Sequence, residues 1–340
     1  MLTENEVFIE DIEYIKSTIT KDITSSSFLI TGACGMIGTM LSFALMQAGA
    51  KVYGVDISSE RANERFSEYM NNGSFVFINC DITNPLPFDF DVDYIIHAAS
   101  NAYPKAFEVD PVGTMLQNFF GTKYLLDYAA KKKARLLYIS TGEVYGQYSG
   151  EDFNENSYGW IDVLNPRSCY PCSKRAAETL LASYVKQYDA DALTVRLSHT
   201  YGLTATAADT RASTEFLRCG AAGEDIVMKS KGEQVRSYTY IADCIGAVLF
   251  VLFNGVCGEA YNIAFESGII SIRDMAELIA DLSGVAVRFE LPDEAQAASF
   301  NPATRSVLNA SKLSQLGYEA HYDIYEGIKR TLRALKQKYE

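Results

Sequence analysis

The sequence predicts an α/β fold, in which a doubly wound parallel sheet is followed by a smaller C-terminal α/β lobe. Short apolar runs alternate with stretches of helical periodicity through the first two hundred residues, as in folds built from repeated strand–helix units. A glycine-rich turn separates the first apolar run from the helix that follows it. The length of 340 residues is sufficient for one such domain and an appended lobe.

Composition narrows the class of protein. Hydrophobic residues make up 48% of the chain and charged residues 21%, which is ordinary for a globular domain. The net charge of −13 disfavours nucleic acid and anionic membranes as partners. Seven scattered cysteines indicate a reducing compartment rather than a disulfide framework. The acidic amino terminus does not resemble a signal peptide, and the apolar run 245–253 is too short to span a bilayer. We expect a soluble, cytoplasmic protein.

An N-terminal extension, residues 1–25, precedes the first strand. Val7, Ile12, Ile15 and Ile19 recur at helical spacing. We expect an amphipathic helix that packs on the body of the protein or on a partner subunit.

The glycine turn is the first motif that indicates a ligand. Gly32, Gly35 and Gly38 lie between an apolar strand at 28–30 and a helix at 39–48. Strand, glycine turn and helix together are typical of a Rossmann-like dinucleotide-binding crossover, with phosphates on the free N–H groups of the helix N-terminus. The spacing is GxxGxxG rather than GxGxxG, and an ordinary strand–helix turn is the alternative interpretation.

Asp56 supports the dinucleotide interpretation. It closes a second strand at 51–56, eighteen residues beyond Gly38, where an acid would accept hydrogen bonds from the adenosine ribose. Because a carboxylate there repels a 2′-phosphate, we predict NAD rather than NADP as the cofactor.

The third and fourth predicted strands end at the same edge of the sheet as the glycine turn and Asp56. Asp81 and Ile82 are placed to contact the adenine, while Ala98 and Ala99 leave room for the dinucleotide. We interpret His97 as a packed strand-end histidine rather than a catalyst. The remaining strands of the main sheet are expected at 75–80, 92–100, 135–140 and 192–198, with a helix at 114–126.

Tyr170 and Lys174 form a YxxxK pair. On a helix they share one face, where the ammonium would stabilise a tyrosinate and lower the tyrosine pKa from about 10. That creates a general base usable near neutral pH. Thr141, at the end of the fifth strand, could donate a hydrogen bond to a substrate hydroxyl. Cys169 and Cys172 flank Tyr170, but no second motif supports a redox site there.

The ordered set of glycine turn, Asp56, Ser-Thr strand end and YxxxK resembles the extended short-chain dehydrogenase/reductase family, the NAD-dependent epimerases and dehydratases. The likeness covers the chain from Ser26 onward and is closest to the UDP-glucuronate decarboxylases (UDP-xylose synthases). The segments that carry it are His97-Ala-Ala-Ser100, Asp110-Pro-Val-Gly-Thr-Met115 with Asn118, Ser140-Thr-Gly-Glu-Val-Tyr-Gly146, and Pro166-Arg-Ser-Cys-Tyr170 with Lys174-Arg175.

The resemblance implies a cofactor, a substrate class and an arrangement of domains. It implies an enzyme that holds NAD and acts on a nucleotide sugar by transient oxidation at C4. The NAD-binding domain would comprise 26–202 and about 236–265, and the substrate-binding lobe about 203–235 and 266–340. A homodimer is expected through helices at about 114–130 and 173–188. The residues expected to contact NAD are Gly32, Gly35, Met36, Ile37, Gly38, Asp56, Asp81, Ile82, Ala98, Ala99, Ser100, Asn118, Ser140, Tyr170, Lys174 and Leu197.

Four residues are expected to bind the substrate. Arg236 resembles the family's phosphate-binding arginine, and Arg211 is a second candidate because the planar guanidinium suits phosphate. Arg305 resembles a late arginine that meets phosphate or a uronate carboxylate. His199 replaces the family's usual asparagine near the nicotinamide, and its contact with substrate is a hypothesis. No Ser-His-Asp arrangement or metal-ligand cluster is recognisable in the sequence, so no metal is expected.

Gly142 departs from the family pattern and leaves the reaction open. At the position of Gly142, between Thr141 and Glu143, the decarboxylase pattern has a serine and the 4,6-dehydratase pattern has an aspartate. The glycine therefore weakens the interpretation as a dehydratase most. Decarboxylation of a nucleotide-linked uronate is the first hypothesis, with Thr141 and Tyr170 in the oxidation, Glu143 as acid/base and Arg305 on the carboxylate. A 4-epimerase is second, followed by a net dehydrogenase or reductase and a 4,6-dehydratase. A non-catalytic NAD sensor would not need the Tyr170/Lys174 pair.

Overall fold

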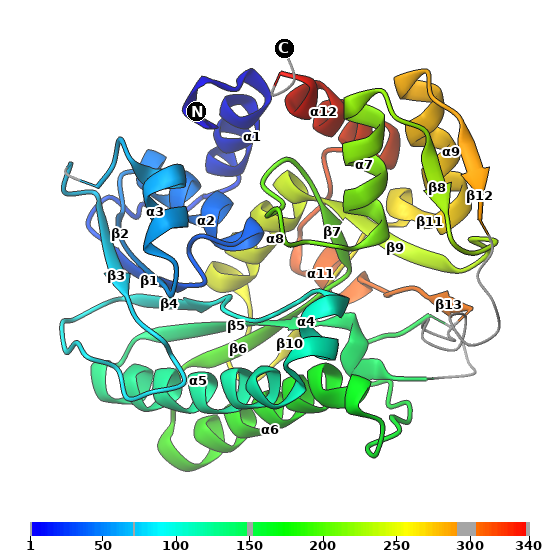
Figure 1. Ribbon diagram of the computed structural model, residues 1–340. Helices are drawn as coiled ribbons and strands as arrows, with labels where there is room; N and C mark the ends of the chain where they lie inside the picture. Colours follow the sequence, from blue (N-terminus) through cyan, green and yellow to red (C-terminus); the bar gives the residue numbers. More distant parts are fainter. Residues whose placement is uncertain (1, 71, 148–151, 291–303, 338–340) are drawn as a thin grey trace.

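A seven-stranded, wholly parallel sheet forms the main body of the protein, in the order β10-β6-β5-β4-β1-β2-β3. The computed structural model describes residues 2–70, 72–147, 152–290 and 304–337 (Figure 1). The strands are β1 (Ser27–Thr31), β2 (Lys51–Asp56), β3 (Phe75–Asn79), β4 (Tyr94–His97), β5 (Arg135–Thr141), β6 (Ala192–Leu197) and β10 (Ala260–Ile263). Because β1 pairs with β2 on one side and β4 on the other, the strand order reverses there and opens a crevice at the carboxyl ends.

Helices cover both faces of this sheet, as predicted for a doubly wound fold. α2 (Met36–Gln47) and α8 (Ile241–Asn254) pack on one face, and α5 (Pro111–Lys132) and α6 (Cys169–Tyr188) on the other (Figure 1). Successive side chains of β1 point to opposite faces of the sheet. Phe28 and Ile30 therefore pack into the hydrophobic core on one face, and Leu29 packs into the core on the other. None of the described helices is both long enough and apolar enough to cross a membrane.

The N-terminal extension packs on the body of its own chain. Helix α1 (Glu6–Ser17) contacts α2, α8 and the C-terminal α12 (Ile324–Lys336). Val7 and Ile15 are fully buried along its apolar face. The buried carboxylate of Asp11 pairs with Arg330 of α12 at 2.8 Å. The helix therefore ties the first and last segments of the chain together.

A second lobe stands over the carboxyl ends of the main sheet. Its sheet contains β7 (His199–Tyr201), β9 (Val235–Tyr240), β11 (Ile269–Ser271) and β13 (Arg305–Ser306), and β8 (Ile226–Met228) pairs separately with β12 (Val287–Phe289). Helices α7 (Ala212–Ala222), α9 (Ile272–Ser283) and α12 pack together beside these strands.

The boundary between the lobes differs from the one expected from sequence. Residues 199–201 and 236–240 were expected in the main domain, yet β7 and β9 pair with each other in the second sheet. β10 takes the edge position beside β6, so the main sheet has no place there for either strand. Shorter elements join the larger ones: α3 (Ser59–Phe66), α4 (Pro104–Val109), α11 (Ser311–Leu316), and the 3-10 turns η1 (Leu2–Glu4), η2 (Gly142–Tyr145), η3 (Pro166–Ser168) and η4 (Glu266–Gly268).

Candidate active site

The glycine turn is shaped by close backbone contacts. Gly32 has a φ of +67°, and a Cβ there would lie 2.8 Å from the backbone of Ala99. A Cβ on Gly38 would lie 2.1 Å from the Gly32 carbonyl oxygen, so only glycine lets α2 start so near β1. The first N–H groups of α2, at Met36 and Ile37, have no partner within the helix. This cradle fits the pyrophosphate of a dinucleotide.

Asp56 lies at the end of β2, beside the turn. One carboxylate oxygen accepts a hydrogen bond from the Cys34 N–H at 3.1 Å, and the other accepts from the Ser58 N–H at 3.0 Å. Arg61 lies 3.9 Å away. The carboxylate is thus fixed next to the turn, at the position that the sequence predicts for ribose recognition.

The end of β4 is joined to α5 and α6 by a chain of polar side chains. The Ser100 hydroxyl donates to the Asn118 side-chain oxygen at 2.8 Å, and the Asn118 amide donates to Ser173 at 2.9 Å. Asn118 is fully buried. His97 is buried too, with Nδ1 2.8 Å from the Thr31 hydroxyl, and burial lowers its pKa to about 3. It is a packed, neutral histidine, as the sequence indicated.

Several expected cofactor contacts have other partners in the structure. The Ser140 hydroxyl is buried and donates to Glu178 at 2.5 Å. The Asp81 carboxylate accepts from the backbone and hydroxyl of Thr83. The Ile82 side chain packs against Gly121 of α5. Ala98 and Leu197 are half-buried at the ends of β4 and β6.

Tyr170 and Lys174 lie in the first two turns of α6, both almost fully buried. The Lys174 ammonium donates to the Ile139 carbonyl at 2.7 Å and lies 5.9 Å from the centre of the Tyr170 ring. The ring of Phe107, from α4, stacks on Tyr170 with centroids 4.6 Å apart. The Thr141 hydroxyl, at the end of β5, forms a hydrogen bond with Tyr170. The structure therefore brings the three residues together.

The electrostatics of the pair differ from the prediction. Burial and the negative charge of Glu143 raise the pKa of Tyr170 above its usual range, although the hydrogen bond from Thr141 and the charge of Arg211 act in the opposite direction. Burial also lowers the pKa of Lys174 to about 7. The predicted fall in the pKa of Tyr170 is not observed, because burial penalises the charged forms of both Tyr170 and Lys174.

Glu143 has a partner that the sequence analysis missed. It lies on η2, directly after Thr141, and Arg167 of η3 grips both of its carboxylate oxygens, at 3.1 and 3.0 Å. The Arg167 guanidinium also lies 4.7 Å from the centre of the Phe107 ring. The signal was present in the Pro166-Arg-Ser-Cys-Tyr170 segment, where the arginine precedes Tyr170 by three residues.

The space beside Gly142 is occupied. A Cβ on this glycine would lie 3.1 Å from the nearest methyl of Leu308, which is buried near β13. The serine or aspartate that the resemblance places here would press against that leucine. The contact gives this part of the site an apolar wall.

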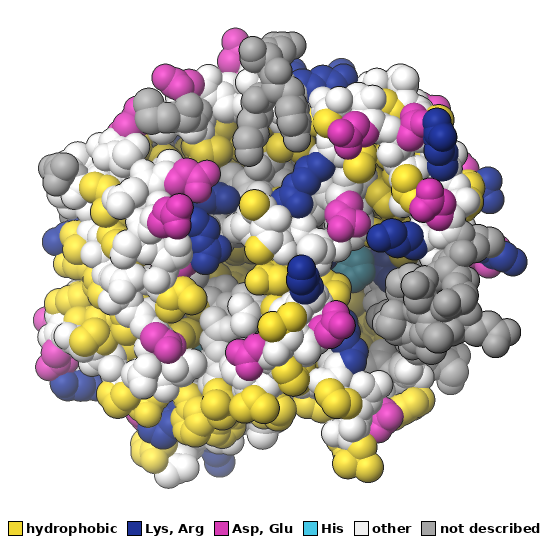
Figure 2. Space-filling view, in the orientation of Figure 1, with side chains coloured by type: hydrophobic (Ala, Val, Ile, Leu, Met, Phe, Trp, Pro, Cys, Tyr) yellow, Lys and Arg dark blue, Asp and Glu magenta, His cyan; other side chains and the backbone are white. Residues whose placement is uncertain are grey.

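The second lobe contributes positive charge. Arg236 of β9 is 4% exposed, and burial lowers its pKa while nearby Tyr238 and Glu143 act in the opposite direction. His199 lies in the same cluster, because burial and the charges of Arg236 and Arg211 lower its pKa to about 3. Figure 2 shows a hollow between the main body and the second lobe, with basic side chains around its rim. Buried cations at such a hollow suit an anionic ligand.

Two of the four expected substrate residues are engaged elsewhere. Arg211 forms a bidentate pair with Asp209 and donates to the Thr200 carbonyl at 3.0 Å. Arg305 pairs with Asp152 at 2.7 Å. In register, Arg305 lies opposite Val235 of β9 rather than Arg236, so its side chain leaves the sheet on the other face.

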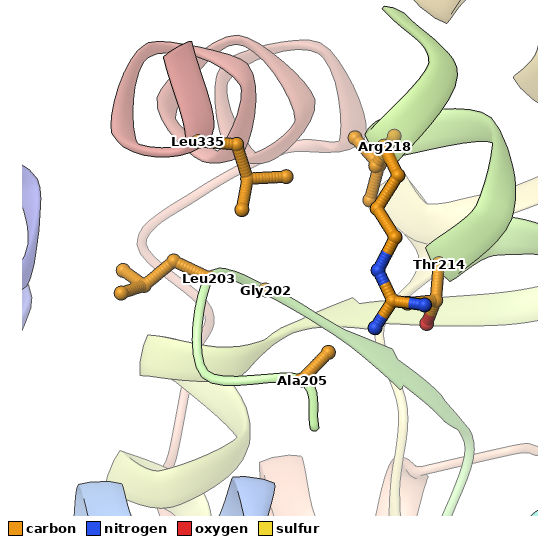
Figure 3. A pocket seen from close by; sticks show the side chains of 7 residues that line it. Gly202, Leu203, Ala205, Thr214, Arg218 and Leu335 are labelled. Atoms are coloured by element: carbon orange, nitrogen blue, oxygen red, sulfur yellow. The ribbon is translucent and has the colours of Figure 1, made fainter. Parts of the chain in front are cut away.

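A separate pocket lies between α7, α12 and the loop after β7 (Figure 3). Its volume is about 20 Å³, enough for roughly one water molecule. Its lining residues are Gly202, Leu203, Ala205, Thr214, Leu217, Arg218 and Leu335. None of them belongs to the expected site, and the pocket is too small for a nucleotide sugar.

Comparison with known proteins places the chain in a family. The model of the NAD dependent epimerase/dehydratase family matches residues 28–264. UDP-glucuronic acid decarboxylase 1 of Xenopus tropicalis is 31% identical over 313 residues, which are 92% of this chain and 72% of that protein. UDP-glucuronic acid decarboxylase 6 of Arabidopsis thaliana is 29% identical over 88% of this chain and 86% of its own length.

Solved structures share the fold at lower identity. Epimerase Mth375 of Methanothermobacter thermautotrophicus has a TM-score of 0.82 and 22% identity, covering 98% of this chain and 97% of that one. A UDP-glucuronic acid 4-epimerase from Bacillus cereus, with UDP-glucuronic acid and NAD, has a TM-score of 0.78 and 24% identity over 92% of this chain and all of that one. With its glycine cradle, Asp56 and Tyr170/Lys174 pair, this enzyme belongs to the NAD dependent epimerase/dehydratase family.

Proposed function

We propose that the protein decarboxylates a nucleotide-linked uronic acid such as UDP-glucuronate, through transient oxidation at C4. The observation that carries the proposal is the convergence of Thr141, Glu143 and Tyr170 at the carboxyl end of β5. The decarboxylases that are similar along nearly the whole chain support this choice of reaction.

The cofactor site would be formed by the glycine turn, Asp56 and the N-terminus of α2. Bound there, NAD would supply the hydride acceptor for oxidation at C4 and the hydride donor for the final reduction. Tyr170 exchanges a proton with the sugar 4-hydroxyl, which Thr141 orients. Because burial disfavours the tyrosinate, this step depends on the cations near Tyr170, which are Lys174, Arg167 and Arg211.

The decisive step follows the oxidation. A 4-keto-uronate is a β-keto acid, so it loses CO₂ without a strong acid catalyst. The enolate that remains takes up a proton at C5, and Glu143, whose charge acts on Tyr170, is the carboxyl group that would manage this proton. Arg236 would bind the diphosphate. A role for Arg305 at the carboxylate requires that it leave Asp152.

A 4-epimerase is the second candidate. Arg305, the arginine expected at the uronate carboxylate, is paired with Asp152 instead, so the substrate carboxylate lacks its expected partner. Epimerisation needs only Tyr170, Lys174 and Thr141, together with rotation of the keto-sugar.

A panel of nucleotide sugars separates the two. Purified protein is incubated with UDP-glucuronate, UDP-glucose and their C4 epimers, and the products are analysed by mass spectrometry and NMR. Loss of the mass of CO₂ from UDP-glucuronate is the expected result. An unchanged mass with an inverted C4 would support the epimerase instead, and loss of water would indicate a dehydratase. No turnover of any sugar, with NAD bound, would refute the enzymatic proposal.

A further inference from the structure

Arg167 was not among the expected site residues, yet it makes a two-point contact with the expected site residue Glu143. Its guanidinium makes two parallel contacts with Glu143, at 3.1 and 3.0 Å, which is the arrangement that fixes a carboxylate in both position and orientation. Side-chain exposures of 39% for Arg167 and 29% for Glu143 show that the pair borders solvent rather than the core.

The same arginine is also tied to Tyr170. Its guanidinium lies over the Phe107 ring, and that ring stacks on Tyr170 at an interplanar angle of 18°. Both Phe107 and Tyr170 are buried. Arg167, Glu143 and Tyr170 thus form one unit built from η3, η2 and α6, with α4 supplying the apolar spacer.

We propose that Arg167 is a positioning residue: it clamps Glu143 beside Tyr170 and offsets the carboxylate's charge there, so that Tyr170 can release its proton. Without the arginine, Glu143 would stand as an uncompensated negative charge next to the group that must become an anion. The inference rests on the proposed function of Tyr170. It adds Arg167 to the site, as a residue that acts on Tyr170 through Glu143.

Charges from several elements act on Tyr170. They come from η2, η3, α6 and the segment before α7: Glu143, Arg167, Lys174 and Arg211. Tyr138 of β5 also lies near Tyr170, but burial raises its pKa and keeps it neutral. Helix α4 presents Phe107 to Tyr170, while its charged residues Lys105 and Glu108 are exposed. Removing Arg167 and removing Glu143 must therefore have opposite effects on the tyrosine.

The first test is the pH dependence of C4 oxidation, followed as single-turnover reduction of bound NAD by UDP-glucuronate. In Arg167→Gln, the pH midpoint should move up by about one unit, because a cation near Tyr170 is lost. In Glu143→Gln it should move down, and in the double variant it should return toward wild type. Arg167→Lys should keep the wild-type midpoint with a lower rate, since it keeps the charge without the two-point grip.

Arg175→Gln is the matched control. Arg175 also supports η2, but it donates to the backbone carbonyls of Val144 and Gly159 rather than to a carboxylate. This variant should leave the midpoint in place. If Arg167→Gln lowers the rate equally at every pH, or if the double variant keeps the raised midpoint, Arg167 has a structural role only and the inference is wrong.

A second measurement needs no substrate. In protein with isotope-labelled arginine, NMR should show slow guanidinium rotation for Arg167 and faster rotation in Glu143→Gln. Equal rotation in both would overturn the clamp. Slow rotation with no turnover of any sugar would instead sustain the clamp and refute the proposed reaction, so the two failures can be told apart.

Discussion

Burial sets the protonation states at the centre of the site. Tyr170, Lys174 and His199 lie in a region where the charged form of each is penalised, so the tyrosine keeps its proton and the histidine stays neutral at physiological pH. The pKa of Lys174, lowered to about 7, makes its charge sensitive to pH in the physiological range. A buried lysine held in this way reduces the stability of the fold.

Replacing Lys174 should therefore separate activity from stability. Since the lysine is harder to protonate when folded, its contribution to the free energy of unfolding rises as pH increases from about 7 toward its usual pKa near 10. Lys174→Met should lose activity by at least about 100-fold. It should unfold at a higher temperature than wild type at pH 6, with the difference shrinking by pH 9.

Calorimetry at the two pH values measures this effect. Lys186→Met, an exposed lysine of the same helix, serves as the control and should change neither activity nor the pH dependence of unfolding. A Lys174→Met protein that is less stable than wild type at pH 6 would contradict the argument.

Among the elements, the turn between β1 and α2 has the least tolerance for change. A Cβ on Gly38 would lie 2.1 Å from the Gly32 oxygen, whereas one on Gly35 would lie 3.1 Å from the same atom. The first contact is with rigid backbone and cannot be relieved by a side-chain rotation. The second needs a shift of only a few tenths of an ångström.

Alanine substitutions at these two glycines should give different results. Gly38→Ala lies within α2, where alanine ordinarily gains about 1 kcal/mol over glycine. Here it should instead lower the free energy of unfolding by about 1–3 kcal/mol and weaken NAD binding at least tenfold, because α2 must move from β1. Gly35→Ala should keep most of the wild-type stability and most of the affinity for NAD. Urea titration and a fluorescence titration with NADH measure the two effects, and tight NADH binding by Gly38→Ala would refute the packing argument.

Local patterns predicted the elements well and their tertiary partners poorly. The apolar runs and the glycine turn predicted the parallel sheet, and α1 was recognised from the spacing of Val7, Ile12 and Ile15. The pairing of β7 with β9 in the second sheet was not predicted, because strand partners that lie far apart in the chain share no local pattern.

The site shows the same limit. Spacing along one helix predicted that Tyr170 and Lys174 lie together, but it could not predict how far burial shifts their pKa values. The partner of Glu143 was missed because Arg167 lies on a different element, and the Asp152 partner of Arg305 is more than 150 residues away. The position of Arg167 just before Tyr170 was a local signal for the first pair, whereas the Arg305–Asp152 pair leaves none in a single sequence.

At the scale of the whole molecule, helix α5 presents two apolar faces. One face packs into the core through Leu125, Leu126 and Ala129. The other is exposed and carries Val112, Met115, Leu116, Phe119 and Phe120, which recur at the spacing of a helical stripe. Figure 2 shows hydrophobic side chains gathered along this edge of the molecule, where Figure 1 places α5. A contiguous exposed stripe of this kind is typical of an interaction surface.

We expect this stripe to pair with its copy on a second chain. A two-fold axis beside α5 would bury the same residues on both subunits and form a closed homodimer. Phe119→Glu should then yield a monomer in sedimentation velocity at concentrations where wild type is a dimer, because two carboxylates would be buried near the axis. Tyr325→Glu, at a comparably exposed aromatic residue of α12, should remain dimeric. A wild-type protein that sediments as a monomer, or a Phe119→Glu protein that stays dimeric, would exclude α5 as the interface.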